Sequence, residues 1–244
     1  MSGKLIESRL LQAYQCDRFG NMRPLILMNE LQGMGDRHAE KLGVGYEYCE
    51  AHGIAWVVTH YLVDIIEMPT EREKFQIITW PSMSDNLRAM RDFEIRGNDG
   101  RLMVRATSQW ILIDLNTRRP ARLAEHLPEF ENVPERAWDR TFDRFPEFDA
   151  TQTHVMKCRF DDIDVNQHIN NAVYAVWATE SVGYEYRSQH QLRRIELNFK
   201  KEIKPDTPQV EIDVAIDGLT SHHRIRTGDT EHAIVICEWE DLKG

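Results

Sequence analysis

Two stretches of the chain carry apolar residues at the spacing of an α-helix. In residues 24–43, apolar or small side chains recur every three or four positions, which predicts a helix with one face turned toward a core. Pro24 suits the first turn of a helix, and Gly43 suits the position just past its end. A second helix is predicted over residues 170–186, which read NNAVYAVWATESVGYEY.

Segments with strand-like composition accompany both predicted helices. They are rich in β-branched and aromatic residues, which fit a pleated sheet better than a helix. Residues 98–100, Asn-Asp-Gly, are a strong hairpin signal between two of these segments. The predicted strands are 54–66, 75–81, 87–97 and 101–115 in the first half, and 153–160, 192–203, 209–217, 222–227 and 232–240 in the second half.

The order of these elements describes one unit twice, with helix starts roughly 145 residues apart. A helix followed by antiparallel strands is an α+β pattern, and a long helix wrapped by a curled antiparallel sheet is the hotdog fold. We therefore predict an α+β protein with two tandem hotdog units, which form a pseudo-dimer within one chain. The predicted units are 1–130 and 151–244. Between them, a proline-rich stretch without a steady period predicts a linker at 131–150.

Composition and charge narrow the class of protein. The chain is 41% hydrophobic and 29% charged, which is typical of a soluble globular protein. It has no long apolar run for a membrane span and no apolar segment of a signal peptide near its start, so we expect a cytoplasmic protein. A net charge of −10 argues against binding to nucleic acid or anionic membranes. The four cysteines lack zinc-site spacing, so we expect reduced thiols and no metal.

Candidate chemistry gathers in residues 159–181, RFDDIDVNQHINNAVYAVWATES. Asp164, Asn166 and His168 alternate there, and alternate residues of an extended segment share a face. The helix that begins near Asn170 would turn its free backbone N–H groups toward the same place. Taken singly, an Asp or Asn before a helix is more often a cap. Together, a carboxylate, an amide and an imidazole beside such N–H groups suit a site that stabilises developing negative charge.

This stretch resembles the signature of the acyl-acyl-carrier-protein thioesterases of plant plastids and their bacterial relatives. DVNQHINNAVYAVWATES is close to the family pattern D-x-N-Q-H-x-N-N-x-x-Y-x-x-W-x-x-E-S. The strings WVVT (56–59) and LNTRRP (115–120) and the pair Arg91-Asp92 also fall where the family has similar strings, so the resemblance covers nearly the whole chain. It implies hydrolysis of fatty acyl-[acyl-carrier-protein] to free fatty acid and holo-carrier.

The resemblance also implies roles for individual residues. Asp164, Asn166 and His168 match the catalytic positions of the family, and Glu202 matches a catalytic glutamate on the next strand. A cysteine that follows this glutamate in the family is replaced here by Ile203, which argues against a cysteine nucleophile. We expect water activated by Asp164 or Glu202, with His168 orienting or sharing the proton. Covalent attack by a carboxylate stays open.

The first predicted unit lacks this chemistry. Its equivalent stretch, residues 15–29, has no Asp-x-Asn-x-His, so we expect one active site per chain. By the resemblance, this unit holds the acyl chain. Core packing is the alternative interpretation of each of its apolar residues.

The implied partners are an acyl carrier protein with its phosphopantetheine arm and a fatty acyl chain, without a cofactor. Acyl carrier proteins are acidic, so clustered cations are candidates for guiding them, although charge runs are often only solvated surface. The candidates are Arg193, Arg194, Lys200, Lys201, Lys204, Arg118 and Arg119.

Functions other than hydrolysis of fatty acyl-[acyl-carrier-protein] also stay open. They are an acyl-CoA thioesterase, a hotdog dehydratase, which would pair a histidine with a carboxylate and would not need Asn166, and an inactive acyl-binding sensor. The sequence leaves open the acyl chain length and whether two chains form a homodimer.

Overall fold

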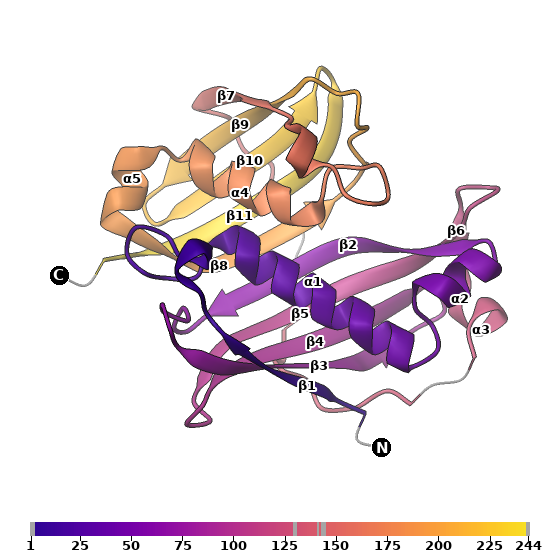
Figure 1. Cartoon of the computed structure of the whole chain (residues 1–244). Helices are drawn as coiled ribbons and strands as arrows, with labels where there is room; N and C mark the ends of the chain where they lie inside the picture. Colours follow the sequence, from indigo (N-terminus) through magenta and orange to yellow (C-terminus); the bar gives the residue numbers. More distant parts are fainter. Residues whose placement is uncertain (1–2, 129–130, 141, 143–144, 243–244) are drawn as a thin grey trace. The chain divides into compact units, whose positions relative to one another are not determined.

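The computed structural model describes residues 3–128, 131–140, 142 and 145–242. It divides into two units, one made of Met1–Arg23 with Asn29–Thr141 and the other of Pro24–Met28 with Phe142–Gly244. Each unit has a long helix against an antiparallel sheet (Figure 1). The prediction of an α+β fold with two tandem hotdog units is confirmed.

The N-terminal sheet has the strand order β1-β3-β4-β5-β2, with β6 paired to β5 and every pairing antiparallel. Helix α1 spans Pro24–Lys41, as its apolar spacing and its Pro and Gly signals predicted. The remaining elements are β1 (Leu5–Leu10), α2 (Tyr46–Ala51), β2 (Ile54–Ile65), β3 (Lys74–Ser84), β4 (Arg88–Gly97), β5 (Leu102–Asp114), β6 (Pro120–Ala121) and α3 (Leu123–His126).

The C-terminal sheet has the order β8-β11-β10-β9-β7, again with antiparallel pairs. Its elements are β7 (Gln152–Lys157), α4 (Asn171–Ser181), α5 (Tyr184–Gln189), β8 (His190–Phe199), β9 (Gln209–Asp217), β10 (Thr220–Thr227) and β11 (Thr230–Asp241). Short 3₁₀ turns at Ala13–Gln15 and Phe160–Asp162 precede α1 and α4.

A buried histidine ties α4 to its sheet. His223 on β10 lies 3.0 Å from the Ser181 hydroxyl through Nδ1 and 2.9 Å from the Ser221 hydroxyl through Nε2. Burial lowers the pKa of His223 to about 3, so the ring is neutral and both of its nitrogens have partners. His223 is therefore a structural residue that links α4 to its sheet.

The two largest differences between predicted and observed elements lie in the C-terminal unit. The helix predicted over 170–186 is broken into α4 and α5 by Gly183, whose φ of 90° and ψ of 159° lie outside helical geometry. The strand predicted over 192–203 ends at Phe199. There the N–H groups of Lys200 and Lys201 both donate to the carbonyl of His232, which ends the regular ladder. Glu202 therefore follows the strand instead of lying on it.

Adjacent residues of a strand point to opposite faces of a sheet, and β4 uses this property at Arg91 and Asp92. Arg91 lies 3.0 Å from the His38 ring on α1. On the other face, the fully buried carboxylate of Asp92 accepts hydrogen bonds from Arg136 Nε at 2.7 Å and from the Ala137 N–H at 3.1 Å. The part of the predicted linker at Arg136 and Ala137 is thus fixed to the N-terminal sheet by the buried carboxylate of Asp92.

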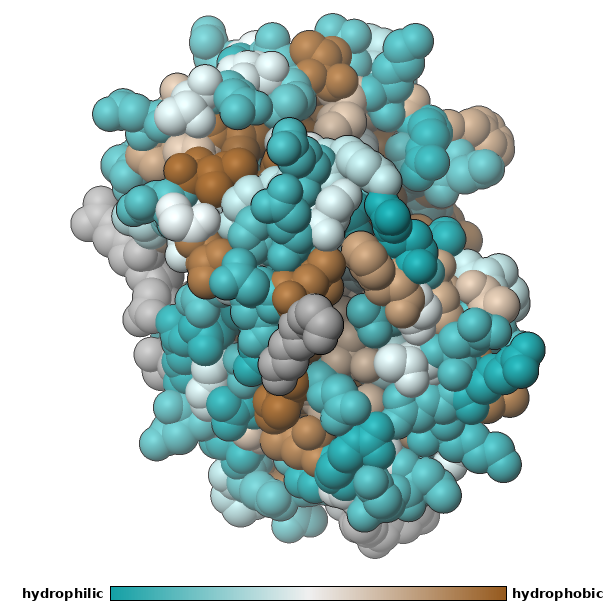
Figure 2. Space-filling view, turned by 90° about the vertical axis from the view of Figure 1, so that its left-hand side faces the viewer, coloured by the Kyte–Doolittle hydropathy of each residue, from teal (hydrophilic) through white to brown (hydrophobic). Residues whose placement is uncertain are grey.

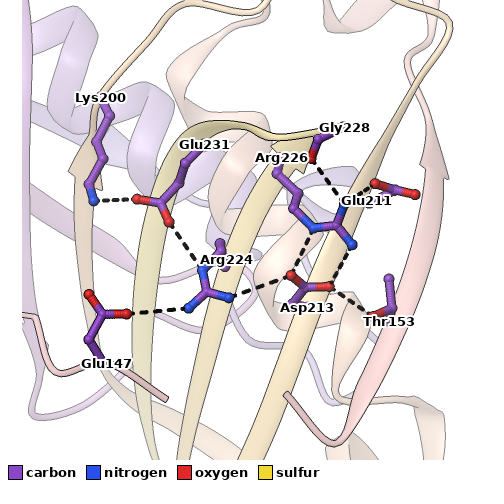
Figure 3. Close-up of polar contacts among 9 residues, drawn as sticks. All are labelled: Glu147, Thr153, Lys200, Glu211, Asp213, Arg224, Arg226, Gly228 and Glu231. Carbon is purple, nitrogen blue, oxygen red and sulfur yellow. Dashed lines mark hydrogen bonds and ion pairs between the residues drawn. The ribbon is translucent and has the colours of Figure 1, made fainter. Parts of the chain in front are cut away.

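The described part of the predicted linker, residues 131–140, 142 and 145–150, contains no helix or strand. Residues 141, 143 and 144 of that prediction lie outside the described residues. The end of the linker meets the C-terminal sheet at Arg224, which pairs with Glu147 at 3.7 Å and with Glu231 at 3.1 Å (Figure 3). These pairs are partly exposed and contribute modestly to stability.

In the parts of the chain that the structure describes, no helix is both long and apolar enough to cross a membrane. The face drawn in Figure 2 is predominantly hydrophilic, with hydrophobic residues in separate small groups. Scattered exposure of this kind is ordinary for a folded protein and marks no binding surface by itself.

We expect Gly183→Ala to lower the free energy of unfolding by about 1–3 kcal/mol, because its backbone conformation is essentially restricted to glycine. An added Cβ at Gly183 would meet no atom within 4 Å, so the loss would come from the backbone alone. Gly33→Ala on α1 is the matched control, since its Cβ would meet only the flexible end of Arg37. Gly33→Ala should leave the free energy of unfolding unchanged or raise it by about 0.5–1 kcal/mol. Urea unfolding measures both, and a Gly183→Ala variant as stable as the parent would contradict this account.

Candidate active site

The segment from Asp164 to His168 is a closed turn and not the extended stretch predicted from its alternation. The Asp164 N–H donates to the His168 carbonyl at 2.8 Å, and the Gln167 N–H donates to the Asp164 carbonyl at 3.0 Å. Gln167 has a φ of 60°, in the left-handed region. Ile163 and Ile169 pair as a bridge across the base of the turn. The extended geometry expected for this segment is therefore wrong, because pleat geometry does not apply inside a turn.

The carboxylate of Asp164 is directed at the backbone of this turn. Its Oδ1 accepts the N–H groups of Asn166 at 2.9 Å and of His168 at 3.3 Å. An aspartate that accepts main-chain N–H groups a few residues ahead stabilises a turn in the same way as a backbone carbonyl would.

His168 and Glu202 form the one direct side-chain contact between predicted catalytic residues that the described structure contains. The imidazole Nε2 lies 3.2 Å from Oε2 of Glu202. Their side chains are 32% and 38% exposed, so both are open to a reactant from solvent and neither is isolated from water. A carboxylate at this distance can orient the ring.

The main chain builds this contact. The Ile169 N–H donates to the Ile203 carbonyl at 3.2 Å, and each of these residues directly follows one member of the His168–Glu202 pair. The ring of His232 fixes the second segment, with Nδ1 at 3.0 Å from the Lys201 carbonyl.

The start of α4 lies directly after the turn. Asn170 is its N-cap and accepts the Ala172 N–H on its side-chain oxygen at 2.8 Å. Asn170 is thus a capping residue, and it occupies one of the N–H groups that the helix start would otherwise present. Asn166 is exposed on the turn, and its side chain has no hydrogen-bond partner within the described ranges.

Sequence reasoning missed two residues that hold the segment around Glu202. One is His232, which nothing in the sequence distinguishes from an ordinary structural or surface histidine. The other is Tyr174 on α4, which is buried and makes a hydrogen bond with the backbone of Ile203. Burial raises the pKa of Tyr174, so it remains a neutral phenol. Its place in the signature was the only signal, because its spacing on the helix is also that of a core residue.

The thiols are inert in their surroundings. Cys16, Cys49 and Cys237 are buried, and Cys158 is half-buried. Burial raises the pKa of Cys49 to about 11, and burial also raises the pKa of Cys158. A thiol with a raised pKa is a poor nucleophile near neutral pH. Among the described residues, no group of three or more His, Cys, Asp or Glu side chains is arranged to hold a metal ion.

Three of the seven basic candidates are paired with acids. Arg193 lies 3.2 Å from Glu240, Arg194 lies 2.7 Å from Glu238, and Lys200 pairs with Glu231. Lys201 and Lys204 are exposed and have no ion pair within the described residues. Arg118 and Arg119 are exposed at the turn after β5. The pairing leaves Lys201 and Lys204 as the cations nearest Glu202 in sequence that are available to a partner.

The N-terminal unit contains a pocket between α1 and its sheet. Its wall is mostly apolar, with Asp36 and Arg91 as charged members. Burial lowers the pKa of Arg91 to about 10, and burial together with Arg91 lowers the pKa of His38 to about 4. His38 is therefore neutral and can accept a hydrogen bond from Arg91. The pocket is lined by Gly35, Asp36, Ala39, Leu42, Val44, Trp56, Pro81, Ala89, Met90, Arg91 and Trp110.

Similar proteins of known sequence match the chain at moderate identity. It is 29% identical over 229 residues to a chloroplastic palmitoyl-acyl carrier protein thioesterase of Gossypium hirsutum, covering 87% of this chain and 53% of that protein. It is 26% identical over 215 residues to the chloroplastic oleoyl-acyl carrier protein thioesterase 1 of Arabidopsis thaliana, covering 80% and 57%. The chain thus spans about half the length of these curated relatives.

Solved structures share the fold over the whole chain. A Lactobacillus plantarum protein described as an oleoyl thioesterase is 27% identical, with a TM-score of 0.84 and coverage of 99% of this chain and 97% of that one. The 12:0-ACP thioesterase of Umbellularia californica is 21% identical, with a TM-score of 0.86 and coverage of 99% and 98%. Residues 6–130 match the family model of the acyl-ACP thioesterase N-terminal domain, and residues 147–241 match that of the C-terminal domain. The chain therefore belongs to the acyl-ACP thioesterase family.

Proposed function

We propose that this protein hydrolyses the thioester of fatty acyl-[acyl-carrier-protein] and releases free fatty acid and holo-carrier. The observation that carries the proposal is the contact of His168 with Glu202, 3.2 Å apart, next to the N-terminus of α4 in a chain of this family. An acid–base pair beside free N–H groups suits acyl transfer to water.

In the proposed reaction, a water molecule attacks the thioester carbonyl. The His168–Glu202 pair takes the proton of this water, and the leaving group is a thiol with an ordinary pKa of about 8.5, which departs readily as thiolate. The oxyanion is stabilised by the Asn166 amide and by the N-terminal N–H of α4 at Asn171, because Asn170 already accepts the N–H groups of Ala172 and Val173. No cofactor enters this mechanism.

We propose a division of labour between the halves of the chain. Residues 151–244 carry the reacting groups, and residues 1–130 hold the acyl chain, with residues 131–150 as the linker. The mostly apolar pocket of the N-terminal unit supports the second role. A cytoplasmic location and a homodimer stay predictions, which fractionation of cells and sedimentation would test.

An acyl-CoA thioesterase is the second candidate, because the His168–Glu202 contact is equally suited to hydrolysing that thioester. A dehydratase would also use a histidine with a carboxylate. A panel of acyl carrier proteins, acyl-CoA esters and 3-hydroxyacyl substrates, assayed from short to long chains, separates these reactions by product. Free fatty acid from carrier substrates at the highest kcat/KM is the outcome that supports the proposal.

We expect His168→Ala and Glu202→Ala each to lower kcat by about 100-fold or more, the usual scale for losing a positioned acid or base. Asp164→Ala should cause a similar loss, and so should Asn166→Ala if its amide supports the oxyanion. Steady-state kinetics on folded variants provides the measurement. Parental rates in any two of these variants would remove the assignment.

A variant with all four cysteines changed to Ser or Ala should keep most of the activity, because the thiols are protonated and mostly buried. Some stability should be lost where a buried thiol is replaced. Alkylating reagents should likewise leave initial rates nearly unchanged. Complete inactivation by such a reagent, prevented by substrate, would instead indicate a cysteine nucleophile.

Lys201→Glu with Lys204→Glu should raise KM for the carrier substrate several-fold and change kcat little, because steering acts on association. The effect should shrink with rising ionic strength and should be smaller for acyl-CoA, which presents no folded acidic surface. Lys41→Glu with Lys74→Glu, two exposed lysines of the N-terminal unit, is the control with the same change in net charge. Equal effects of the two double variants would show that Lys201 and Lys204 are ordinary solvated surface residues without a role in binding the carrier.

A further inference from the structure

The turn that carries the proposed catalytic residues has a copy in the N-terminal unit. There the Asp17 N–H donates to the Asn21 carbonyl at 2.8 Å, and the Gly20 N–H donates to the Asp17 carbonyl at 3.1 Å. Oδ1 of Asp17 accepts the N–H groups of Phe19 at 2.9 Å and of Asn21 at 3.0 Å. These four bonds repeat those of the Asp164 turn one for one. Gly20 has a φ of 81°, so it occupies the left-handed position that Gln167 takes in the other copy.

The surroundings of the two turns repeat as well. Cys16 and Met22 pair across the base of the first turn, as Ile163 and Ile169 do across the second. The Met22 N–H donates to the Pro69 carbonyl at 2.8 Å, in the place of the bond from Ile169 to Ile203. Each turn also follows a 3₁₀ turn closed by a reciprocal cap, Gln12 with Gln15 in one unit and Arg159 with Asp162 in the other.

The chemistry is not repeated. By these matched bonds, Asn21 stands in the place of His168, and Met68, which precedes Pro69, stands in the place of Glu202. Phe19 likewise stands in the place of Asn166. A phenylalanine, an asparagine and a methionine offer no general acid or base, yet the aspartate is present in both copies with all of its bonds. The need to close the turn is therefore enough to explain why an aspartate stands at this position in both units.

We propose that Asp164 is a positioning residue that closes the turn, and that proton transfer belongs to His168 and Glu202. This inference rests on the proposed function and decides between the two candidate bases that the sequence left open, Asp164 and Glu202. Oδ1 of Asp164 already accepts two backbone N–H groups, one of which is that of His168 itself. The carboxylate therefore fixes the backbone from which the imidazole projects, while Glu202 contacts the ring directly. An asparagine carries an amide oxygen in the same place and can accept the same two bonds.

The test compares an isosteric with a truncating substitution at Asp164. Asp164→Asn should keep kcat within about tenfold of the parent, whereas Asp164→Ala and Glu202→Gln should lose about 100-fold or more. The acid limb of the pH–rate profile should keep its midpoint in Asp164→Asn and should shift or disappear in Glu202→Gln. The neighbouring Tyr174 and Cys158 do not contribute to the acid limb of this profile, because burial raises the pKa of each and keeps both neutral there. The charge of Lys201 is unchanged in every variant.

Asp17→Ala is the matched control, since it removes the same bonds from the copy without acid–base groups. It should lower the melting temperature about as much as Asp164→Ala while leaving kcat near that of the parent. Loss of activity in Asp164→Asn as deep as in Glu202→Gln, with the turn intact, would overturn the inference in favour of Asp164 as the base.

An intact turn is recognised without substrate, by slow hydrogen exchange at the N–H groups of Asn166 and His168. This exchange should be nearly parental in Asp164→Asn and faster in Asp164→Ala, and equal exchange in all three proteins would also overturn the inference. Failure of the proposed function looks different. In that case the parent releases no fatty acid from any thioester, or His168→Ala and Glu202→Gln are both fully active, while the exchange result still decides the role of Asp164 in the turn.

Discussion

One main-chain hydrogen bond, from the Ile169 N–H to the Ile203 carbonyl, sets the geometry on which the candidate site depends. It joins the turn before α4 to the segment after β8. Because His168 directly precedes Ile169 and Glu202 directly precedes Ile203, the same bond brings His168 next to Glu202. His168 and Glu202 are far apart in sequence, and neither segment alone could bring them together. Because backbone N–H and C=O groups at such a crossing must be satisfied, the contact is built into the fold and does not rely on flexible side chains.

The same crossing exists in the N-terminal unit, where Met22 bonds to Pro69. The duplicated scaffold therefore specifies a turn, a cap and a crossing, and it does not specify chemistry. Chemistry depends on which side chains occupy the repeated positions. This separation explains why Asp17 and Asp164 share every hydrogen bond of the turn, although only the second turn carries a histidine that contacts a glutamate.

Strand alternation gives the N-terminal unit two different faces at one place on β4. Arg91 lies on the face of α1 and the apolar pocket, and Asp92 lies on the opposite face, where it bonds to Arg136 of the predicted linker. Asp92 is buried and Arg91 is half-buried, so both charges need polar partners, which are Arg136 for Asp92 and His38 for Arg91. The pair of adjacent charges thus connects the pocket wall to the attachment of the linker through a single strand.

The sequence by itself determined the repeated order of helix and strands, the start and end of α1, the hairpin at residues 98–100 and the residues of the signature, because these follow from local periodicity and turn chemistry. It could not determine the break at Gly183, since a glycine within a helical pattern is compatible with either outcome. It also misjudged residues 164–168, because alternation describes a strand and the side chain of Asp164 closes a turn instead. Only the tertiary structure decided which carboxylate meets His168, because that contact depends on a hydrogen bond between segments more than thirty residues apart.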